Sequence, residues 1–360
     1  MKFLSKCFSF PTETSTDHKI IRGQQICPST VHAFSYKQLQ LATNHFHSSN
    51  KIGDGGFGSV YKGRLEDGRL VAVKVFSIES RKGDEEFMAE IASVSDISHE
   101  NLVRLHGGCI DGPSRIIVYD YMENNNLAQT LHGGEKIREK INWKIRREIC
   151  LGIARGLTHI HEEVKPHIVH RDIKARNVLL DHKFVPKLSD FGLSKLFSDN
   201  ITHISTRVAG TLGYLAPEYA ISGHLSRKSD MYSFGVLLLE IVSGRTAVDF
   251  DIQLGEHYLV QKAWDMYQAN KLEELVDPTL TWNSSDIIEA VLFLKVGLLC
   301  VQQKCRRRPS MCVAVKMMRD EIDINDVQIS EPGLITNIMD VKIGRKTSSL
   351  HNPTVLPHPL

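Results

Sequence analysis

The chain has 360 residues, a formal net charge of +2 and 24% charged residues of both signs. This length allows a large core in two lobes, and the balanced charge argues against a nucleic-acid-binding protein, which usually carries a strong basic excess. Its seven cysteines form no Cys-x-x-Cys pair and no zinc-ligand spacing, a pattern typical of the reducing cytoplasm. No apolar run reaches the roughly 18 residues of a transmembrane span.

The N-terminal part is predicted to hold a leader and one short helix. Residues 1–33 carry Ser, Thr, Pro and Gln without sustained periodicity, which favours a flexible leader. Within it Cys7 lies among Phe3, Leu4 and Phe8, so it is a candidate for palmitoylation and peripheral membrane attachment; a free thiol in a disordered tail is the alternative. Residues 34–51 are predicted to contain an amphipathic helix that begins after the N-cap Ser35.

A glycine-rich loop follows in the stretch Ile52-Gly-Asp-Gly-Gly-Phe-Gly-Ser-Val60. Glycines at this spacing let the backbone approach phosphate groups closely. Dinucleotide-binding folds use the same spacing but need a helix starting at the glycines. Here the chain continues as a strand, turns near residues 65–69 and returns as a second strand over 70–76, so the loop bridges a β-hairpin.

Lys74 lies inside that second strand among apolar residues, an unfavourable place for a charge unless it has a partner and a task. A helix is predicted over residues 84–95, because Phe87, Ile91 and Val94 share one face. An apolar strand over 115–121 then gives way to a polar stretch over 122–126. Asn142 is a candidate N-cap for a long helix that leads toward His170.

The strongest chemical signal comes from the stretch Val169 to Asn177, together with Asp190-Phe191-Gly192. Asp172, Asn177 and Asp190 supply a proton acceptor and oxygen ligands for Mg²⁺. Phosphoryl transfer needs both, because a base must receive the proton of the incoming hydroxyl while a hard cation neutralises phosphate charge. The set therefore indicates a phosphotransferase.

These motifs occur together with Val71-Ala-Val-Lys74 and Ala216-Pro-Glu218, in the same order as in eukaryotic protein kinases. The chain from about residue 34 to 321 therefore resembles that family. The segment Phe34-Ser-Tyr-x-x-Leu-x-x-Ala-Thr-x-x-Phe46 is similar to the one just ahead of the kinase domain in plant receptor-like kinases. The chain as a whole most resembles the plant receptor-like cytoplasmic kinases of the cold-responsive type. The resemblance implies an α+β, bilobal protein-kinase fold. A small β-rich N-lobe with one main helix would span about 52–121, a mostly helical C-lobe about 127–323, and residues 324–360 would be a disordered tail.

The resemblance also implies ATP and Mg²⁺ (or Mn²⁺) as cofactors, and it assigns roles to residues. Asp172 would be the catalytic base, Lys174 would neutralise the transferring phosphoryl group, and Asn177 and Asp190 would hold the metal. Lys74 would hold the α- and β-phosphates and pair with Glu90, with Glu86 as the alternative. The ATP-binding set would be Ile52, Gly53, Asp54, Gly55, Gly56, Phe57, Gly58, Val60, Ala72, Lys74, the gatekeeper Tyr119, the backbones of Asp120 and Met122, and Asn126 near the ribose.

Control by phosphorylation is predicted for the segment that follows Asp190. Arg171, directly before the catalytic Asp172, is a cation placed to receive a phosphate group. Ser205 or Thr206 would carry that phosphate, and Thr211 would help to seat the acceptor residue.

The predicted function is a cytoplasmic protein serine/threonine kinase of plant stress or receptor signalling, since lysine at position 174 is the Ser/Thr-kinase pattern. Its partners would be protein substrates and an upstream membrane receptor kinase. Three alternatives are a pseudokinase scaffold, a dual-specificity kinase that also modifies Tyr, and a small-molecule phosphotransferase. The intact Lys74, Asp172 and Asp190 argue against the first, and the peptide-docking segment 210–218 argues against the last.

Overall fold

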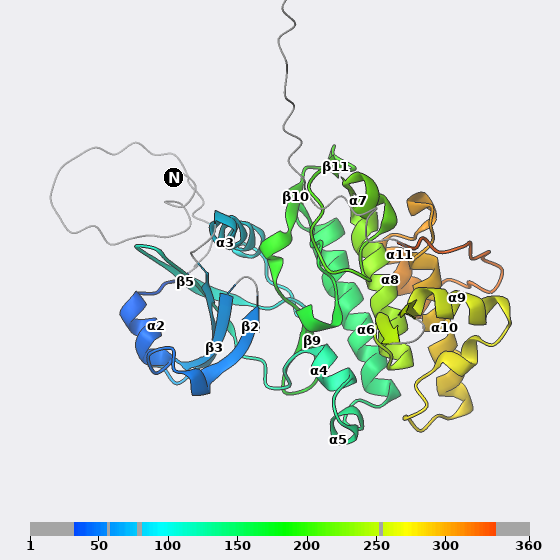
Figure 1. Cartoon of the computed structure of the whole chain (residues 1–360), viewed down its shortest axis with the longest axis horizontal. Coiled ribbons are helices and arrows are strands. Elements are labelled where there is room, and N and C mark those ends of the chain that lie inside the picture. The colour runs from blue at the N-terminus through cyan, green and yellow to red at the C-terminus, as the bar shows by residue number, and fades with distance from the viewer. Residues whose placement is uncertain (1–31, 56–57, 78–80, 252–254, 336–360) are drawn as a thin grey trace, which may run out of the picture.

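The computed structural model describes residues 32–55, 58–77, 81–251 and 255–335, which form two lobes joined by one connection (Figure 1). The N-lobe holds β1 (His32–Ala33), α2 (Tyr36–Ala42), β2 (Lys51–Gly55), β3 (Gly58–Arg64), β4 (Leu70–Phe76), α3 (Arg81–Val94), β5 (Leu105–Asp111) and β6 (Ser114–Asp120). The helices of the C-lobe are α4 (Leu127–Leu131), α5 (Glu135–Arg138), α6 (Trp143–Thr158), α7 (Pro217–Ser222), α8 (Arg227–Ser243), α9 (Leu259–Gln268), α10 (Ser284–Cys300) and α11 (Met311–Met318). Its short strands are β7 (His167–Val169), β8 (Val178–Leu180), β9 (Pro186–Leu188), β10 (Lys195–Phe197), β11 (Ile204–Ser205), β12 (His224–Leu225), β13 (Val248–Asp251) and β14 (Gly255–Tyr258).

The N-lobe sheet has six strands in the order β1-β5-β6-β4-β3-β2, antiparallel except for the β1–β5 pair. Side chains alternate between its two faces. On β4, Val71 and Val73 are buried in a core that includes Leu39 of α2. Lys74 follows Val73 directly and therefore lies on the opposite face, toward the C-lobe.

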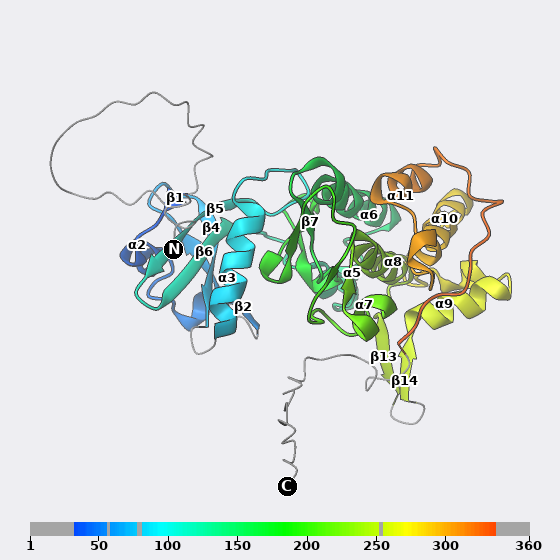
Figure 2. The same cartoon turned by 90° about the horizontal axis from the view of Figure 1, so that it is seen from above.

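Helix α3 packs on that second face, as Figure 2 shows. Phe87, Ile91 and Val94 are buried, and the Phe87 ring meets the Phe76 ring edge to face with centroids 5.5 Å apart. The predicted apolar stripe is confirmed, although the helix begins at Arg81 rather than Asp84.

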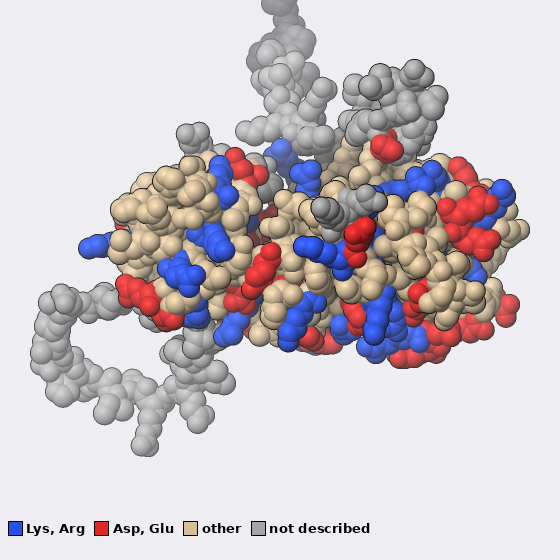
Figure 3. Space-filling view, turned by 90° about the horizontal axis from the view of Figure 1, so that it is seen from below, with Lys and Arg blue, Asp and Glu red and all other residues tan. Residues whose placement is uncertain are grey.

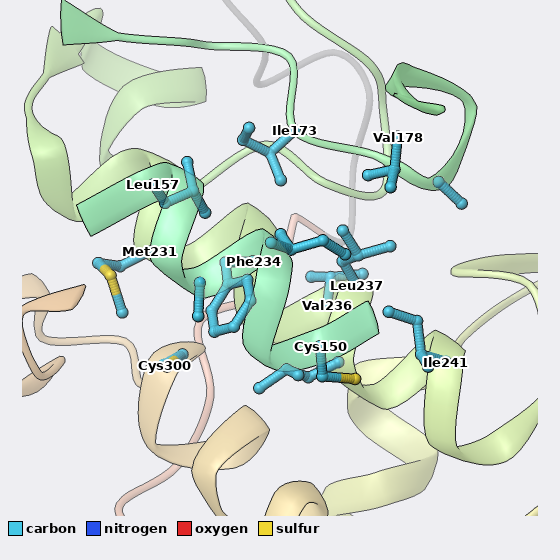
Figure 4. Close-up of a cluster of buried hydrophobic side chains, with 14 of the residues drawn as sticks. Cys150, Leu157, Ile173, Val178, Met231, Phe234, Val236, Leu237, Ile241 and Cys300 are labelled. Atoms are coloured by element: carbon cyan, nitrogen blue, oxygen red, sulfur yellow. The ribbon is translucent and has the colours of Figure 1, made fainter. Parts of the chain in front are cut away.

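The C-lobe is built around α8, which is buried along nearly its whole length. In Figure 4 its Phe234 and Leu237 meet side chains of α6, and Ile173 and Val178 reach toward the same cluster from the catalytic loop and the strand after it. The crossing of α8 with α10 is so close that a Cβ added to Gly235 would lie 2.8 Å from the Gly297 carbonyl oxygen. This rigid core fixes the catalytic loop.

Two predicted boundaries are wrong. The leader was expected to run to residue 33, but His32 and Ala33 form β1 and pair with Gly107 and Gly108 of β5. A disordered tail was expected from residue 324, but Ile324, Ile329 and Ile335 are buried against the C-lobe. A two-residue strand and an irregular extended segment have no periodicity that a sequence could reveal. The rest of both tails, Cys7 included, lies outside the described residues.

In the part of the chain that the structure describes there is no membrane-spanning helix, and the face drawn in Figure 3 shows no stripe of one charge. No helix there is long and apolar enough to cross a bilayer. The face drawn in Figure 3 carries acidic and basic side chains side by side. Neither sign dominates that face, as the balanced composition predicts.

Candidate active site

A cavity of about 300 Å³ lies between the lobes. Its lining includes most of the predicted nucleotide-site residues: Ile52, Gly53, Asp54, Gly55, Gly58, Val60, Ala72, Lys74, Glu90, Tyr119, Asp120, Met122, Asn126, Asn177 and Asp190. Gly56 and Phe57 of the same set lie outside the described residues. A larger hollow of about 980 Å³, on the N-lobe around α2, contains none of the predicted catalytic groups.

Lys74 joins the two lobes through a pair of carboxylates. Its Nζ lies 2.8 Å from Glu90 Oε2 on α3 and 2.8 Å from Asp190 Oδ1 in the C-lobe. Burial alone would lower the pKa of Lys74, but the two negative charges outweigh it and raise that pKa. Burial would raise the pKa of Asp190, yet the charge and hydrogen bond of Lys74 bring it below its usual value. The N-lobe partner of Lys74 is thus Glu90, as predicted, and not the alternative Glu86.

The other oxygen of Glu90 is occupied by the predicted gatekeeper. The Tyr119 hydroxyl donates to Glu90 Oε1 at 2.6 Å, and both side chains are buried. Burial, strengthened by the nearby Glu90 charge, raises the pKa of Tyr119 well above its usual value, so the phenol stays a donor. Tyr119 thus ties β6 to α3 behind the cavity.

The connection between the lobes follows Tyr119. The amide of Asp120 donates to the Arg104 carbonyl at 3.2 Å, and its carboxylate lies 2.5 Å from His106 Nε2. Asn126 lines the cavity but also caps α4, because its Oδ1 accepts from the Gln129 amide at 3.0 Å. The predicted ribose contact at Asn126 would have to share that side chain with the cap.

Asp172 is the centre of a compact polar cluster in the catalytic loop. Its Oδ1 accepts from the Thr211 hydroxyl at 2.7 Å. Its Oδ2 accepts from Lys174 Nζ at 2.7 Å and from Asn177 Nδ2 at 2.9 Å. Lys174 also reaches the Thr211 oxygen, at 2.7 Å. The candidate base Asp172, the Lys174 ammonium and the Thr211 hydroxyl are therefore within hydrogen-bonding distance of one another.

The catalytic loop is anchored to the C-lobe by Asp230 of α8. This buried carboxylate accepts from the backbone amides of His170 and Arg171, at 2.7 and 2.8 Å, and lies 2.9 Å from His161 Nε2. Burial would raise the pKa of Asp230, but the hydrogen bond and charge of His161 lower it. Arg171 adopts a left-handed φ of 74°, which this anchoring stabilises.

Asn177 and Asp190 form the candidate metal site. Asn177 Nδ2 donates to the Asp172 carbonyl at 2.8 Å, which leaves its Oδ1 as the acceptor. Asp190 uses Oδ1 for Lys74, and its other oxygen remains for a cation. Elsewhere in residues 32–335, as far as they are described, no group of three or more His, Cys, Asp or Glu is placed to hold a metal. Two hard oxygen donors fit Mg²⁺, which takes few protein ligands beside phosphates and water.

Comparison with known proteins decides the family. A protein kinase domain model matches residues 46–321. The chain belongs to the protein kinase family. It is 51% identical to cold-responsive protein kinase 1 of Arabidopsis thaliana, over 90% of this chain and 83% of that protein. It is 48% identical to a probable LRR receptor-like serine/threonine-protein kinase of the same plant, over 89% of this chain but only 30% of the relative. The receptor-like relatives are thus far longer than this kinase.

The predicted phosphate receiver Arg171 is fully engaged with neutral groups. Its guanidinium donates to the carbonyls of Leu193 and Arg207, each at 2.8 Å, and to the Tyr219 hydroxyl. Ser205 is exposed in β11, and the Thr206 amide donates to the Gly223 carbonyl at 3.0 Å. The Arg207 carbonyl that accepts from Arg171 belongs to the residue that follows Thr206.

The end of the activation segment is tied to the C-lobe by a partly buried ion pair. Arg308 donates to both oxygens of Glu218, at 2.7 and 2.8 Å, and Arg308 is fully buried. The bidentate geometry fixes the start of α7, and with it the loop that carries Thr211.

Sequence reasoning missed several residues of the cavity. Those absent from the prediction are Val103, Asn125, Gln129, Arg176, Leu179 and Ser189. Val103 and Leu179 supply apolar walls but stand in no chemical motif. Leu179 could have been found from its place two residues after Asn177, because alternation along β8 turns it toward the cavity.

Proposed function

We propose that this kinase transfers the γ-phosphoryl group of ATP to Ser and Thr hydroxyls of proteins. The observation that carries the proposal is the 2.7 Å contact of the Thr211 hydroxyl with Asp172 Oδ1, beside Lys174. A hydroxyl-bearing side chain is held there on the candidate base, as an acceptor hydroxyl would be. The Ser/Thr class is also the one printed in the name of the receptor-like relative.

In the proposed reaction Asp172 orients the acceptor hydroxyl and receives its proton as the new P–O bond forms. The bond between the γ-phosphorus and the β–γ bridging oxygen breaks at the same time, and ADP leaves with that oxygen. The Lys174 ammonium neutralises charge that develops on the phosphoryl oxygens. Lys74 holds the α- and β-phosphates and is itself positioned by Glu90. The hairpin glycines 53, 55 and 58 offer backbone amides to the phosphates.

Asn177 and Asp190 would hold Mg²⁺ or Mn²⁺. The bound cation would neutralise phosphate charge and orient the γ-phosphoryl group. Because Asp190 keeps one oxygen on Lys74 at 2.8 Å, the residue would link the lysine, the cation and the phosphates.

The experiment is transfer of ³²P from ATP to a generic protein substrate, followed by phosphoamino-acid analysis. Label on Ser or Thr is expected from the wild type, with transfer reduced to background in Lys74→Met. Label on Tyr as well would indicate dual specificity. Equal transfer by wild type and Lys74→Met would overturn the proposal in favour of a pseudokinase scaffold.

We further propose that phosphorylation of Ser205 or Thr206 controls the enzyme. A phosphate is a charged acceptor and would bind Arg171 more strongly than the neutral carbonyls that it contacts now. Mass spectrometry of active enzyme is expected to find the phosphate, and the Ser205→Ala/Thr206→Ala variant is expected to lose activity. An unphosphorylated segment with full activity of the double variant would refute this control.

The cellular setting is proposed from the relatives. Several relatives are named as receptor-like kinases, which supports an upstream membrane receptor kinase as the activator. A cytoplasmic location with peripheral membrane attachment through Cys7 would bring this kinase close to such a receptor. Replacing Cys7 by Ser and following membrane fractionation would test the attachment.

A further inference from the structure

Two histidine rings are stacked on the small sheet that β11 and β12 form. His203, just before β11, lies against His224 of β12 with the ring centroids 4.1 Å apart and the ring planes 19° from parallel. His203 is exposed, His224 is half-buried, and neither forms an ion pair with a carboxylate among the residues that the structure describes. The Thr202 hydroxyl lies 3.1 Å from His203 Nδ1, which leaves Nε2 of that ring for another partner. The pair can therefore offer N–H groups to an anion.

The strand register places Ser205 beside this pair, because Ser205 is directly opposite His224 in the antiparallel ladder. The next pair along the ladder is joined by the hydrogen bond from the Thr206 amide to the Gly223 carbonyl at 3.0 Å. Since hydrogen-bonded and non-hydrogen-bonded pairs alternate, Ser205 and His224 are a non-hydrogen-bonded pair, whose Cα atoms are only about 4.5 Å apart. Their side chains share one face of the sheet. His203 lies two residues before Ser205, and its stacking on His224 places it on that same face.

The opposite face of this small sheet is turned into the C-lobe. Leu225 is fully buried and its ladder partner Ile204 is half-buried, whereas Ser205 is exposed. Arg171 is buried as well, and its guanidinium is engaged with carbonyl oxygens. A phosphate on Ser205 would therefore lie on the exposed face, beside the histidine rings. The half-buried Thr206 is the better candidate for Arg171.

We propose that His203 and His224 bind the phosphate group of phosphorylated Ser205. The proposal rests on the proposed control by activation-segment phosphorylation and adds a receiver for this site. Phosphorylation would join Ser205 Oγ to the γ-phosphorus of ATP, with loss of the hydroxyl proton and departure of ADP. The product carries a charge of about −1.5 to −2 near neutral pH, and imidazole N–H donors, above all those of protonated imidazole, bind such a group strongly. Because β12 begins two residues after α7 ends, the bound phosphate would fix the activation segment to the C-lobe.

Arg207 is the rival receiver, because it is exposed and lies only two residues after Ser205. Its backbone carbonyl accepts from Arg171 at 2.8 Å, but that contact does not engage the Arg207 guanidinium. An experiment on the phosphate of Ser205 must therefore separate the two histidines from this arginine.

The test is hydrogen exchange in the full-length chain with phosphoserine installed during synthesis at position 205, or at position 206 as the control. All proteins carry Lys74→Met, so that they do not phosphorylate themselves. The reporter is the amide of residue 206, whose hydrogen bond to Gly223 holds β11 on β12. Phosphate at position 205 is expected to slow its exchange about 10-fold or more, and by less than about 2-fold in His203→Ala/His224→Ala. Arg207→Ala should keep the full slowing, and the effect of phosphate at position 206 should not depend on the histidines.

Each variant is compared with and without its phosphate, so a merely structural role of the ring stack affects both forms and cancels. His203→Ala alone, at an exposed position, gives the same comparison if the double variant does not fold.

Three results would overturn the phosphate site: no slowing by phosphate at position 205, slowing that persists without the histidines, or slowing that only Arg207→Ala removes. The exchange is measured without phosphoryl transfer. A failed ³²P assay would therefore refute the kinase activity separately, whatever the exchange shows.

Discussion

The carboxylate of Glu90 is 1% exposed and has two different partners, Lys74 on one oxygen and the Tyr119 hydroxyl on the other. Burial raises the pKa of Glu90, and the Lys74 charge opposes that rise. Tyr119 adds a neutral donor on the side that Lys74 does not reach. The position of α3 over the cavity thus depends on the gatekeeper as well as on the lysine.

Replacing Tyr119 by Phe tests this dependence. The ring is kept, and Glu90 loses a donor, so the free energy of unfolding should fall by about 1.5–3 kcal/mol, as for hydrogen bonds to charged groups. Chemical denaturation measures the change. Tyr121→Phe is the control, because its ring, with Lys62 Nζ 4.4 Å from the centroid, is also kept. A Tyr119→Phe protein as stable as the control variant would show that the 2.6 Å contact contributes nothing.

At the residue scale the sequence predicted the groups of the motifs and little of what surrounds them. Lys74, Asp172 and Asp190 stand in recognisable strings. The structure brings Lys74 and Asp190 to one cavity, and Asp172 accepts a hydrogen bond from Asn177 of the cavity lining. The Tyr119–Glu90 bond and the engagement of Arg171 with carbonyls are tertiary contacts between distant segments. No local pattern encodes such contacts, since either partner alone is an ordinary residue.

Among the elements, α2 shows how the segment before the glycine loop supports the N-lobe. Ser35 caps the helix reciprocally with Gln38, as a capping box. Leu39 is fully buried against Val71, Val73 and the strands beyond them. The helix thus covers the sheet face opposite the cavity.

Leu39→Ala should therefore destabilise the protein by about 2–5 kcal/mol, the range for cavity-forming Leu→Ala changes in cores. Leu41→Ala, on the exposed side of the same helix, should change stability by less than about 0.5 kcal/mol. Denaturant titration of both variants separates packing from helix propensity, which is the same in each. Equal effects would mean that α2 does not pack on the sheet in solution.

A second element-scale feature is the buried Asp277, which joins the ends of α5, α6 and α8. It accepts from Arg138 at 2.9 Å, from Arg146 at 2.8 Å, and from the Thr279 amide and hydroxyl. Arg146 also donates to the Ile241 carbonyl near the end of α8, at 2.9 Å. Burial would raise the pKa of Asp277, but the Thr279 hydrogen bonds and the Arg146 charge outweigh it and lower that pKa.

A lowered pKa in the folded state stabilises the fold above the unfolded value of about 4, and this contribution is lost as the pH falls through the folded value. Asp277→Asn should cost about 3 kcal/mol near neutral pH, because it leaves buried arginines without their anion. The gap to wild type should shrink below about pH 4. Unfolding free energies across pH would measure this, with Asp265→Asn on the exposed face of α9 as control. A gap that does not depend on pH would contradict the assignment.

Element prediction succeeded where periodicity was strong and failed where it was absent. The stripe of α3 and the cap of α6 at Asn142 are confirmed. Residues Leu272–Leu275 form only a single 3₁₀ turn. The strand β1 and residues 328–335 are held by backbone hydrogen bonds to segments far away in the chain, which no short window of sequence reports.

At the scale of the whole molecule, the predicted catalytic groups come from both lobes and meet at the cleft. Lys74 and Glu90 belong to the N-lobe, whereas Asp172, Asn177 and Asp190 belong to the C-lobe. The 2.8 Å contact of Lys74 with Asp190 joins the N-lobe directly to the C-lobe at the cleft. The fold class and this meeting of motifs could be predicted from their order in the chain, whereas the path of residues 328–335 to the loop that carries Thr211 could not.

The most direct test of this account is the rate of phosphoryl transfer to a Ser-containing peptide by Asp172→Asn, compared with wild type and Asp181→Asn. Asp181 is the matched control, because its Oδ1 accepts from the Lys183 and Val185 amides and an Asn would keep that oxygen. Loss of the base should lower kcat by roughly 10²–10⁴-fold, while the control stays close to wild type. Transfer by Asp172→Asn at the wild-type rate would contradict the assignment of Asp172 as the base of this enzyme.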